Sequence, residues 1–369
     1  MDLLNATRMP AAYTMGAAPD GRERLVVVVK GTFTLPCTPG ETARLAEQQE
    51  PLVMADTFTG EPGFSAPVYE ADFAPEKQRC DVLLVGSAHA PDGQPVERLT
   101  VGLRVGDWKK AFTVTGERRW QTLATVIRAG RPQPFVHQAI SYDGAFGGID
   151  DFGPVESLDA AYAYNPVGKG WHEHALASLV EDTPMPITEE LSRPVEKPDF
   201  DYPPMAFGPV GRGWLPRREF AGTYDDAWLE NTFPFLPADF DPRYYQAAPS
   251  DQQMPFPQGG EPVTVLNLSP HGRLDFRLPR VEVPVVFFRK RGERQETVAV
   301  IDTLLFEPDA NRFSMTWRAS LPLKRDLFEI AQVLVGRMSR AWWRARELGK
   351  TYYPSLAAAV RKTDEEDLD

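Results

Sequence analysis

The side chains best suited to hold a metal ion lie in one short stretch of the sequence. Trp-His-Glu-His at 171–174 would place His172 and His174 on the same face of a strand, within reach of one ion. Zinc needs three or four ligands, and the remaining histidines, His89, His137 and His271, are scattered along the chain. Neither CxxC nor HExxH is present. We therefore expect structural or surface histidines and no metal.

Ser87 is the best candidate for a nucleophile, because it lies between Gly86 and His89 at the end of an apolar stretch. The surrounding residues do not form GxSxG, the motif that exposes a serine on a tight turn. A catalytic serine also needs a base, a third group that orients the base, and donors for the oxyanion. We interpret Ser87 as part of a turn at a strand end.

The sequence Tyr-Asp-Gly-Ala-Phe-Gly-Gly at 142–148 offers Gly144, Gly147 and Gly148 as a cradle for phosphate. It contains neither GxxxxGK[ST] nor GxGxxG, the spacings by which backbone amides surround a nucleotide phosphate. A plain turn is therefore expected, and no cofactor.

The acids Asp143, Asp150 and Asp151 are close enough in sequence to bind calcium or to act as a catalytic pair. Their spacing does not match an EF-hand loop, so we interpret them as solvated loop acids. One alternative stays open: Asp143, Asp150 and Asp225 could surround an aromatic platform, as in a carbohydrate-binding protein or a hydrolase of β architecture.

Strands separated by turns are expected to position these residues. A run of valines, Val26 to Val29, indicates a strand that is buried on both faces. Three or four strands in meander order are predicted for the first region, and the same pattern of apolar runs and turns returns near the end. The expected strands are 24–35, 81–88, 99–105, 108–114, 262–268, 274–278, 281–289, 297–306 and 311–318.

The stretch from about 130 to 260 is rich in proline, glycine and aromatic residues, and neither helical nor strand spacing persists in it. Its many aromatic side chains argue against disorder, because they are too costly to leave in water. We expect an ordered, loop-rich layer that packs on the β core.

The last element differs in kind, because apolar residues recur at helical spacing from Lys324 to Leu348. We predict one helix there, loosened at Gly336. Trp343 falls nearly opposite the apolar stripe, where it could contact a partner or pack against Tyr352 and Tyr353. The chain is thus divided into an N-terminal β region (1–129), the loop-rich layer (130–260), a C-terminal β region (261–322), and a helix with an acidic tail (323–369).

Composition supports a mainly β protein of antiparallel sheets, in a sandwich or barrel-like arrangement. The 35 prolines among 369 residues are close to twice the usual share of about 5%, and proline is unfavourable inside long helices. A net charge of -12 argues against nucleic acid or an anionic membrane as partner.

A cytoplasmic location is expected. Cys37 and Cys80 are the only cysteines, and we interpret them as free buried thiols. The N-terminus lacks the apolar core of a signal peptide, and no apolar run approaches the roughly 18 residues of a membrane span.

An ordered set of short motifs resembles a bacterial family of unknown function, number two thousand one hundred and sixty-nine in its series. No single motif is diagnostic, but their order is. The motifs are Val-Val-Lys-Gly-Thr-Phe (28–33), Ala-Asp-Thr-Phe (55–58), Gly-Glu-Pro-Gly (60–63), Glu-Ala-Asp-Phe-Ala-Pro-Glu-Lys (70–77), Ala-Phe-Gly-Gly (145–148), Asn-Pro-Val-Gly-Lys-Gly (165–170), Phe-Gly-Pro (207–209), Trp-Leu-Pro-Arg (214–217), Ala-Gly-Thr-Tyr-Asp (221–225), Ala-Ala-Pro-Ser-Asp-Gln (247–252) and Gly-Gly-Glu (259–261). The tail that carries Trp343 lies beyond them.

The resemblance implies an accessory protein of type VI secretion, an adaptor or chaperone that helps to mount a PAAR-type effector on the VgrG spike. It implies no catalytic residue. Such an adaptor would bind its partner in a groove or along an open sheet edge, which needs only backbone pairing and apolar pockets. The candidate contact residues are Trp171, Trp214, Tyr224, Trp228 and Trp343.

Overall fold

The valine run forms the centre of the largest sheet. In the computed structural model, which describes residues 1–18, 20–36, 38, 41–150, 161–290 and 292–353, strand β3 spans Glu23–Thr34. Val26 to Val29 are fully buried, as expected for a strand covered on both faces. β3 pairs with β2 (Ala11–Ala17) on one side and with β22 (Arg312–Pro322) on the other, both antiparallel.

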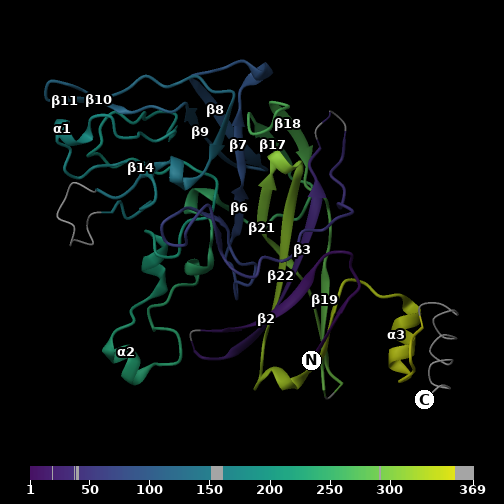
Figure 1. Ribbon diagram of the computed structural model, residues 1–369. Coiled ribbons are helices and arrows are strands. Elements are labelled where there is room, and N and C mark those ends of the chain that lie inside the picture. The colour runs from purple at the N-terminus through teal and green to yellow at the C-terminus, as the bar shows by residue number, and fades with distance from the viewer. Residues whose placement is uncertain (19, 37, 39–40, 151–160, 291, 354–369) are drawn as a thin grey trace, which may run out of the picture.

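Strands from the two ends of the chain share this six-stranded sheet, whose order is β16-β6-β21-β22-β3-β2. The predicted meander is wrong, because β6 (Cys80–Leu84) is separated from β3 by β21 (Val300–Glu307) and β22. β6 and β21 run parallel, and β16 (Gln253–Met254) completes the edge. Figure 1 shows β3, β21 and β22 side by side although nearly 270 residues separate the first two in sequence. 

Two further sheets also mix early and late strands. The five-stranded sheet has the order β15-β9-β8-β17-β18, and the four-stranded sheet has the order β1-β23-β19-β20. Their strands are β15 (Thr188–Glu189), β9 (Trp108–Thr115), β8 (Arg98–Val105), β17 (Pro262–Leu266), β18 (Arg273–Arg277), β1 (Asp2–Asn5), β23 (Ile330–Val335), β19 (Pro284–Arg289) and β20 (Arg294–Val298).

Smaller pairs and short helices decorate this framework. The two-stranded sheets are β4 (Thr57–Phe58) with β5 (Pro67–Tyr69), β7 (Gly86–His89) with β12 (His137–Ile140), β10 (Trp120–Leu123) with β11 (Val126–Ala129), and β13 (Phe146–Gly147) with β14 (Lys169–Gly170). The helices are α1 (Ala177–Val180), α2 (Asp226–Asn231) and α3 (Arg340–Glu347), and the 3-10 turns are η1 (Pro91–Gly93), η2 (Tyr142–Gly144), η4 (Arg217–Ala221), η5 (Pro242–Tyr245), η6 (Ser250–Gln252), η7 (Pro308–Ala310) and η8 (Leu327–Glu329).

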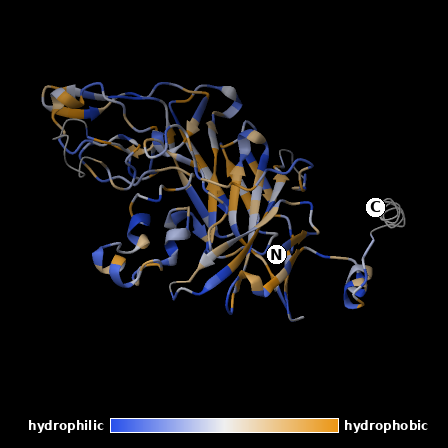
Figure 2. Cartoon of the chain, turned by 60° about the horizontal axis from the view of Figure 1, so that its bottom comes forward, coloured by the Kyte–Doolittle hydropathy of each residue, from blue (hydrophilic) through white to orange (hydrophobic). Residues whose placement is uncertain are grey.

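A single main core lies between the three large sheets. Phe313 on β22 stacks on Phe33 of β3 and Phe306 of β21, and its ring also lies 5.4 Å from that of Phe276 on β18. Figure 2 shows the matching concentration of apolar residues along the central strands. The mainly β prediction is therefore confirmed, and no sheet closes into a barrel within the described residues.

The proline-rich middle region is an ordered layer attached to this framework. Part of it enters the main core, where the rings of Phe207 and Phe112 lie 4.7 Å apart. Another part forms a second apolar cluster, which includes Trp120 of β10 and in which Tyr162 and Tyr202 pack edge-on against Phe146. Gly147, at φ +146°, lets Asn165 approach so closely that a Cβ there would lie 2.1 Å from the Asn165 carbonyl oxygen. Gly144, Gly147 and Gly148 thus belong to a tightly packed turn.

The long helix predicted for Lys324–Leu348 is wrong in its first half. Residues 330–335 form β23, which pairs with β1 and β19, because Ile330, Val333 and Val335 also suit a buried strand. Gly336 ends the strand at φ +88°, and its N–H donates to the Pro284 carbonyl oxygen. Within 324–348 α3 is the only α-helix, and Ser339 caps it by accepting from the Trp342 N–H.

Cys80 is a free thiol buried in the core, and burial raises its pKa well above the ordinary value. Cys37, Asp151 and the acidic tail lie outside the described residues. Among the described helices, not one combines the length and the apolar character that crossing a bilayer requires.

Candidate functional site

The most distinctive surface feature is a small lobe formed by residues 221–241, which we call the projection. It carries α2 and stands away from the strands in both views (Figures 1 and 2). Asp225 begins α2 by accepting a hydrogen bond from the Trp228 N–H at 2.8 Å. This cap satisfies one of the free N–H donors of the first turn. A helix of only six residues needs such a cap in order to form.

Trp228 holds the projection together from the inside. Its indole N–H donates to the Phe235 carbonyl oxygen at 3.0 Å. The rings of Tyr224 and Phe233 pack edge-on against it, with centroids at 4.7 and 5.7 Å. Because Trp228 is only half-buried, this is a miniature aromatic cluster and not a core.

Hydrogen bonds close the base of the projection. Thr223 donates through its hydroxyl to Asp239 at 2.8 Å, and the Asp241 N–H donates to the Phe220 carbonyl oxygen at 2.9 Å. The ring of Phe235 lies against Gly21 in the turn between β2 and β3. The lobe is thus a folded unit with a defined contact to the framework.

Much of the apolar surface of the projection is left uncovered. Tyr224, Leu229, Phe233 and Phe235 each expose between 51% and 62% of their surface. Residues 221–241 include five acids and neither lysine nor arginine, so this apolar surface is bordered by negative charge. The arrangement suits contact with an apolar surface that carries basic side chains around it.

A cleft of about 380 Å³ is lined by residues of several of the sequence motifs, among them Asp56, Trp214 and Arg217, the last of which lies just before the projection in sequence. Arg217, at the start of η4, makes a bidentate ion pair with Glu70 and also donates to the Val210 carbonyl oxygen. Arg212 pairs with Asp56 at 2.8 Å. Burial, the largest single effect, tends to raise the pKa of Asp56, but the hydrogen bonds from Arg212 and from the Ala71 N–H, together with the nearby guanidinium charges, lower it overall.

The five predicted contact residues fall into different environments. Trp214 is a wall of this cleft and is buried in the main core, so it lies outside the exposed surface of the projection. Trp171 packs on the second apolar cluster. Trp343 is half-buried beside Trp342 and Phe288, in a cluster that includes Tyr352. Only Tyr224 and Trp228 come together, on the projection.

Sequence reasoning missed three exposed residues of this surface, Leu229, Phe233 and Phe235. The signal available was their concentration, with Tyr224 and Trp228, in twelve residues (224–235) that hold three acids and neither lysine nor arginine. Their exposure could not be read from that composition, because the same mixture of residues is buried elsewhere in the middle region.

The candidate catalytic and metal-binding residues are mostly engaged in local structure. Asp150 is buried, and its carboxylate accepts a hydrogen bond from the backbone N–H of His174 at 2.8 Å. The same carboxylate is hydrogen-bonded to the ring Nδ1 of His174, also at 2.8 Å, and the ring of His172 lies nearby. Asp143 accepts from Thr59 and from the Ala66 N–H. Asp225 caps α2, so Asp143, Asp150 and Asp225 each have a structural role.

Ser87 is not bonded to His89, as a nucleophile would be to its base. Instead Ser87 and His89 bond to the two oxygens of one carboxylate, that of Asp309, at 2.8 and 2.7 Å. His137 lies beside His89, whereas His271 is exposed on the turn after β17. No motif in the sequence points to Asp309.

The sequence model of a family described as "Uncharacterized protein conserved in bacteria (DUF2169)" matches residues 20–318. The chain belongs to this family. The DUF2169 match includes the cleft, the projection and almost all strands of the six-stranded sheet, whereas β23, α3 and Trp343 lie beyond it. No curated protein and no solved structure matches the chain.

Proposed function

We propose that this protein is a cytoplasmic adaptor that binds another protein through the projection, and that it helps to load a PAAR-type effector onto the VgrG spike of a type VI secretion system. The observation that carries the binding role is the exposed apolar surface of Tyr224, Leu229, Phe233 and Phe235 on an ordered lobe. The identity of the partner rests on the family resemblance alone.

The physical case is that this surface is costly unless something covers it. Full burial of an apolar side chain of this size is worth roughly 1.5–3 kcal/mol, and because these four are already nearly half covered, a partner would gain about half of that from each. Four such side chains on one small lobe resemble the central anchors of a protein interface, which are often aromatic. The aromatic cluster around Trp228 keeps them ordered before binding, which reduces the entropic cost of association.

The acidic border specifies the kind of partner surface. Asp226 and Glu230 are exposed on α2, on the same lobe as the apolar side chains. A partner with lysine or arginine around an apolar patch would associate faster at low salt, and added salt would slow association more than it speeds dissociation.

The test is co-expression of the full chain with the effector encoded beside its gene, followed by affinity capture and a binding titration. Phe233→Asp introduces charge into the exposed surface, and we expect it to abolish capture. Phe328→Asp is the matched control, because Phe328 is 76% exposed and lies outside the family match. Both variants should keep the unfolding temperature of the unaltered protein.

Three results would refute the proposal: no capture of any neighbouring effector, equal loss in the two variants, or capture that survives Phe233→Asp. Capture of the effector that fails to reach VgrG would retain the binding role but refute the loading role.

A further inference from the structure

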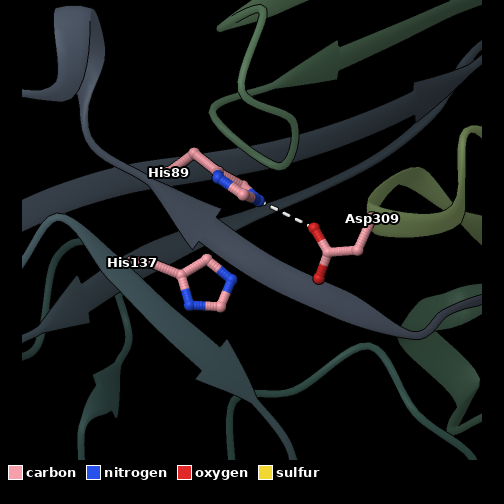
Figure 3. Close-up of side chains that lie close together, drawn as sticks. All are labelled: His89, His137 and Asp309. Carbon is pink, nitrogen blue, oxygen red and sulfur yellow. Dashed lines mark hydrogen bonds and ion pairs between the residues drawn. The ribbon is translucent and has the colours of Figure 1, made fainter.

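Two histidines and one aspartate meet at the surface where three distant chain segments converge. His89 ends β7 and His137 begins β12, and the antiparallel register places these two residues directly opposite each other. Side chains of opposed residues lie on the same face of a sheet, and the two rings are 4.8 Å apart. Asp309 reaches them from η7, the turn between β21 and β22 (Figure 3).

The backbone and one neighbouring side chain fix these groups in place. The His89 N–H donates to the Asn267 carbonyl oxygen at 2.9 Å, and the Ala90 N–H donates to the Val136 carbonyl oxygen at 2.8 Å. Ser87 donates to one oxygen of Asp309 and thereby aims the other at His89. A site whose donors lie on rigid strands and are held by an outer hydrogen bond has the form that metal sites require.

The spacing of the donor atoms suits one ion. One donor from each residue lies within 4.8 Å of the other two. Donors of a tetrahedral zinc site, with bonds of about 2.1 Å, are about 3.4 Å apart. The His89 and Asp309 donors, now 2.7 Å apart, would separate by roughly 0.7 Å, while His137 would move inward. Rotations of side chains on an exposed surface accommodate such shifts.

We propose that His89, His137 and Asp309 bind a divalent transition-metal ion, with Zn²⁺ as the ion of choice. Two imidazoles with a carboxylate favour zinc and its neighbours, whereas Mg²⁺ and Ca²⁺ prefer oxygen donors alone. His137 and Asp309 are exposed, so the fourth position is open to water or to a side chain of a bound protein. Ser87 acts as a positioning residue for Asp309.

The experiment is a calorimetric titration of ZnCl₂ into the full chain, which carries no affinity tag and has been stripped of metal with EDTA. Mg²⁺ is present in excess during the titration. We expect one equivalent of saturable binding, and Co²⁺ in its place should give the visible absorption of a four-coordinate site. His137→Ala and Asp309→Asn should weaken binding by more than about 100-fold, beyond the 10–100-fold typical of outer-shell changes. Ser87→Ala should fall within that outer-shell range.

His174→Ala is the matched control, because His174 is also partly exposed and also lies 2.8 Å from an aspartate oxygen. It should leave zinc binding unchanged, and circular dichroism should show every variant folded. Absence of saturable binding would overturn the proposal and leave the His89–Asp309 contact as a plain hydrogen bond. Unchanged binding in both His137→Ala and Asp309→Asn, or its loss in His174→Ala, would overturn it equally.

Discussion

The two parts of the proline-rich middle region have similar composition but opposite relations to solvent. Residues 161–217 bury most of their aromatic side chains, among them Tyr162, Tyr202 and Phe207, although Tyr164 and Phe200 are about half exposed. Residues 221–241, which begin a few residues later, leave Phe233 and Phe235 more than half exposed. Aromatic content alone therefore indicates that a segment is ordered, but not whether its rings stabilise the fold or remain available to a partner.

The difference lies in how each part is tied to the framework. In the first part, the Phe207 carbonyl oxygen accepts from the Leu84 N–H and from the buried Gln252 amide, so the backbone itself is joined to β6. The projection is closed mainly by bonds within its own lobe, such as that between Thr223 and Asp239. A lobe that is closed by its own hydrogen bonds can stay folded while its apolar side chains remain outside the core.

The largest effect is expected from Phe207→Ala in the first part. Phe207 is fully buried against Phe112, and removing such a ring costs about 3–5 kcal/mol of unfolding free energy through lost burial and a remaining cavity. Urea unfolding of the purified chain measures it. Phe207→Leu retains most of the volume and should cost less than about 1.5 kcal/mol. Equal stability of Phe207→Ala and the unaltered protein would show that the buried aromatic side chains of the first part do not stabilise the fold, contrary to the comparison made above.

A smaller and local effect is expected from Trp228→Ala in the projection. Because Trp228 is half-buried, its loss should destabilise the lobe by roughly 1–2 kcal/mol, a fraction of the 3–5 kcal/mol of a core tryptophan. Limited proteolysis should then cut within 221–241, while the midpoint of global unfolding stays nearly unchanged. If the global midpoint fell as far as in Phe207→Ala, the projection would be part of the core.

The sequence was informative wherever structure depends on near neighbours. The valine run of β3 and the turn at Gly106 between β8 and β9 could both be predicted, because burial and turn chemistry act over a few residues. Pairing between β6 and β21 could not, because more than 200 residues separate them and their apolar pattern does not specify a partner. The same limit applied to β23, whose residues suit a helix or a strand until β1 and β19 flank it.

The candidate sites show this limit more strongly. Tyr224 and Trp228 could be chosen from composition, but Trp214, chosen on the same grounds, is buried. His89, His137 and Asp309 form a cluster only because the register of β7 and β12 and the position of η7 bring them together. Proximity of that kind is a product of long-range topology, which local spacing does not encode.

The smallest effect is expected from Asp225→Ala, which removes the cap of α2 while leaving its apolar surface in place. Loss of an N-cap costs about 1 kcal/mol of local helix stability. The Trp228 amide, which now donates to Asp225, should exchange its hydrogen roughly fivefold faster, as that free energy implies. Asp225→Ser restores a capping oxygen and should exchange almost as slowly as the unaltered protein. Affinity for the partner should fall only modestly in Asp225→Ala, because the exposed rings remain. A fall as large as that expected for Phe233→Asp would instead mean that Asp225 itself contacts the partner.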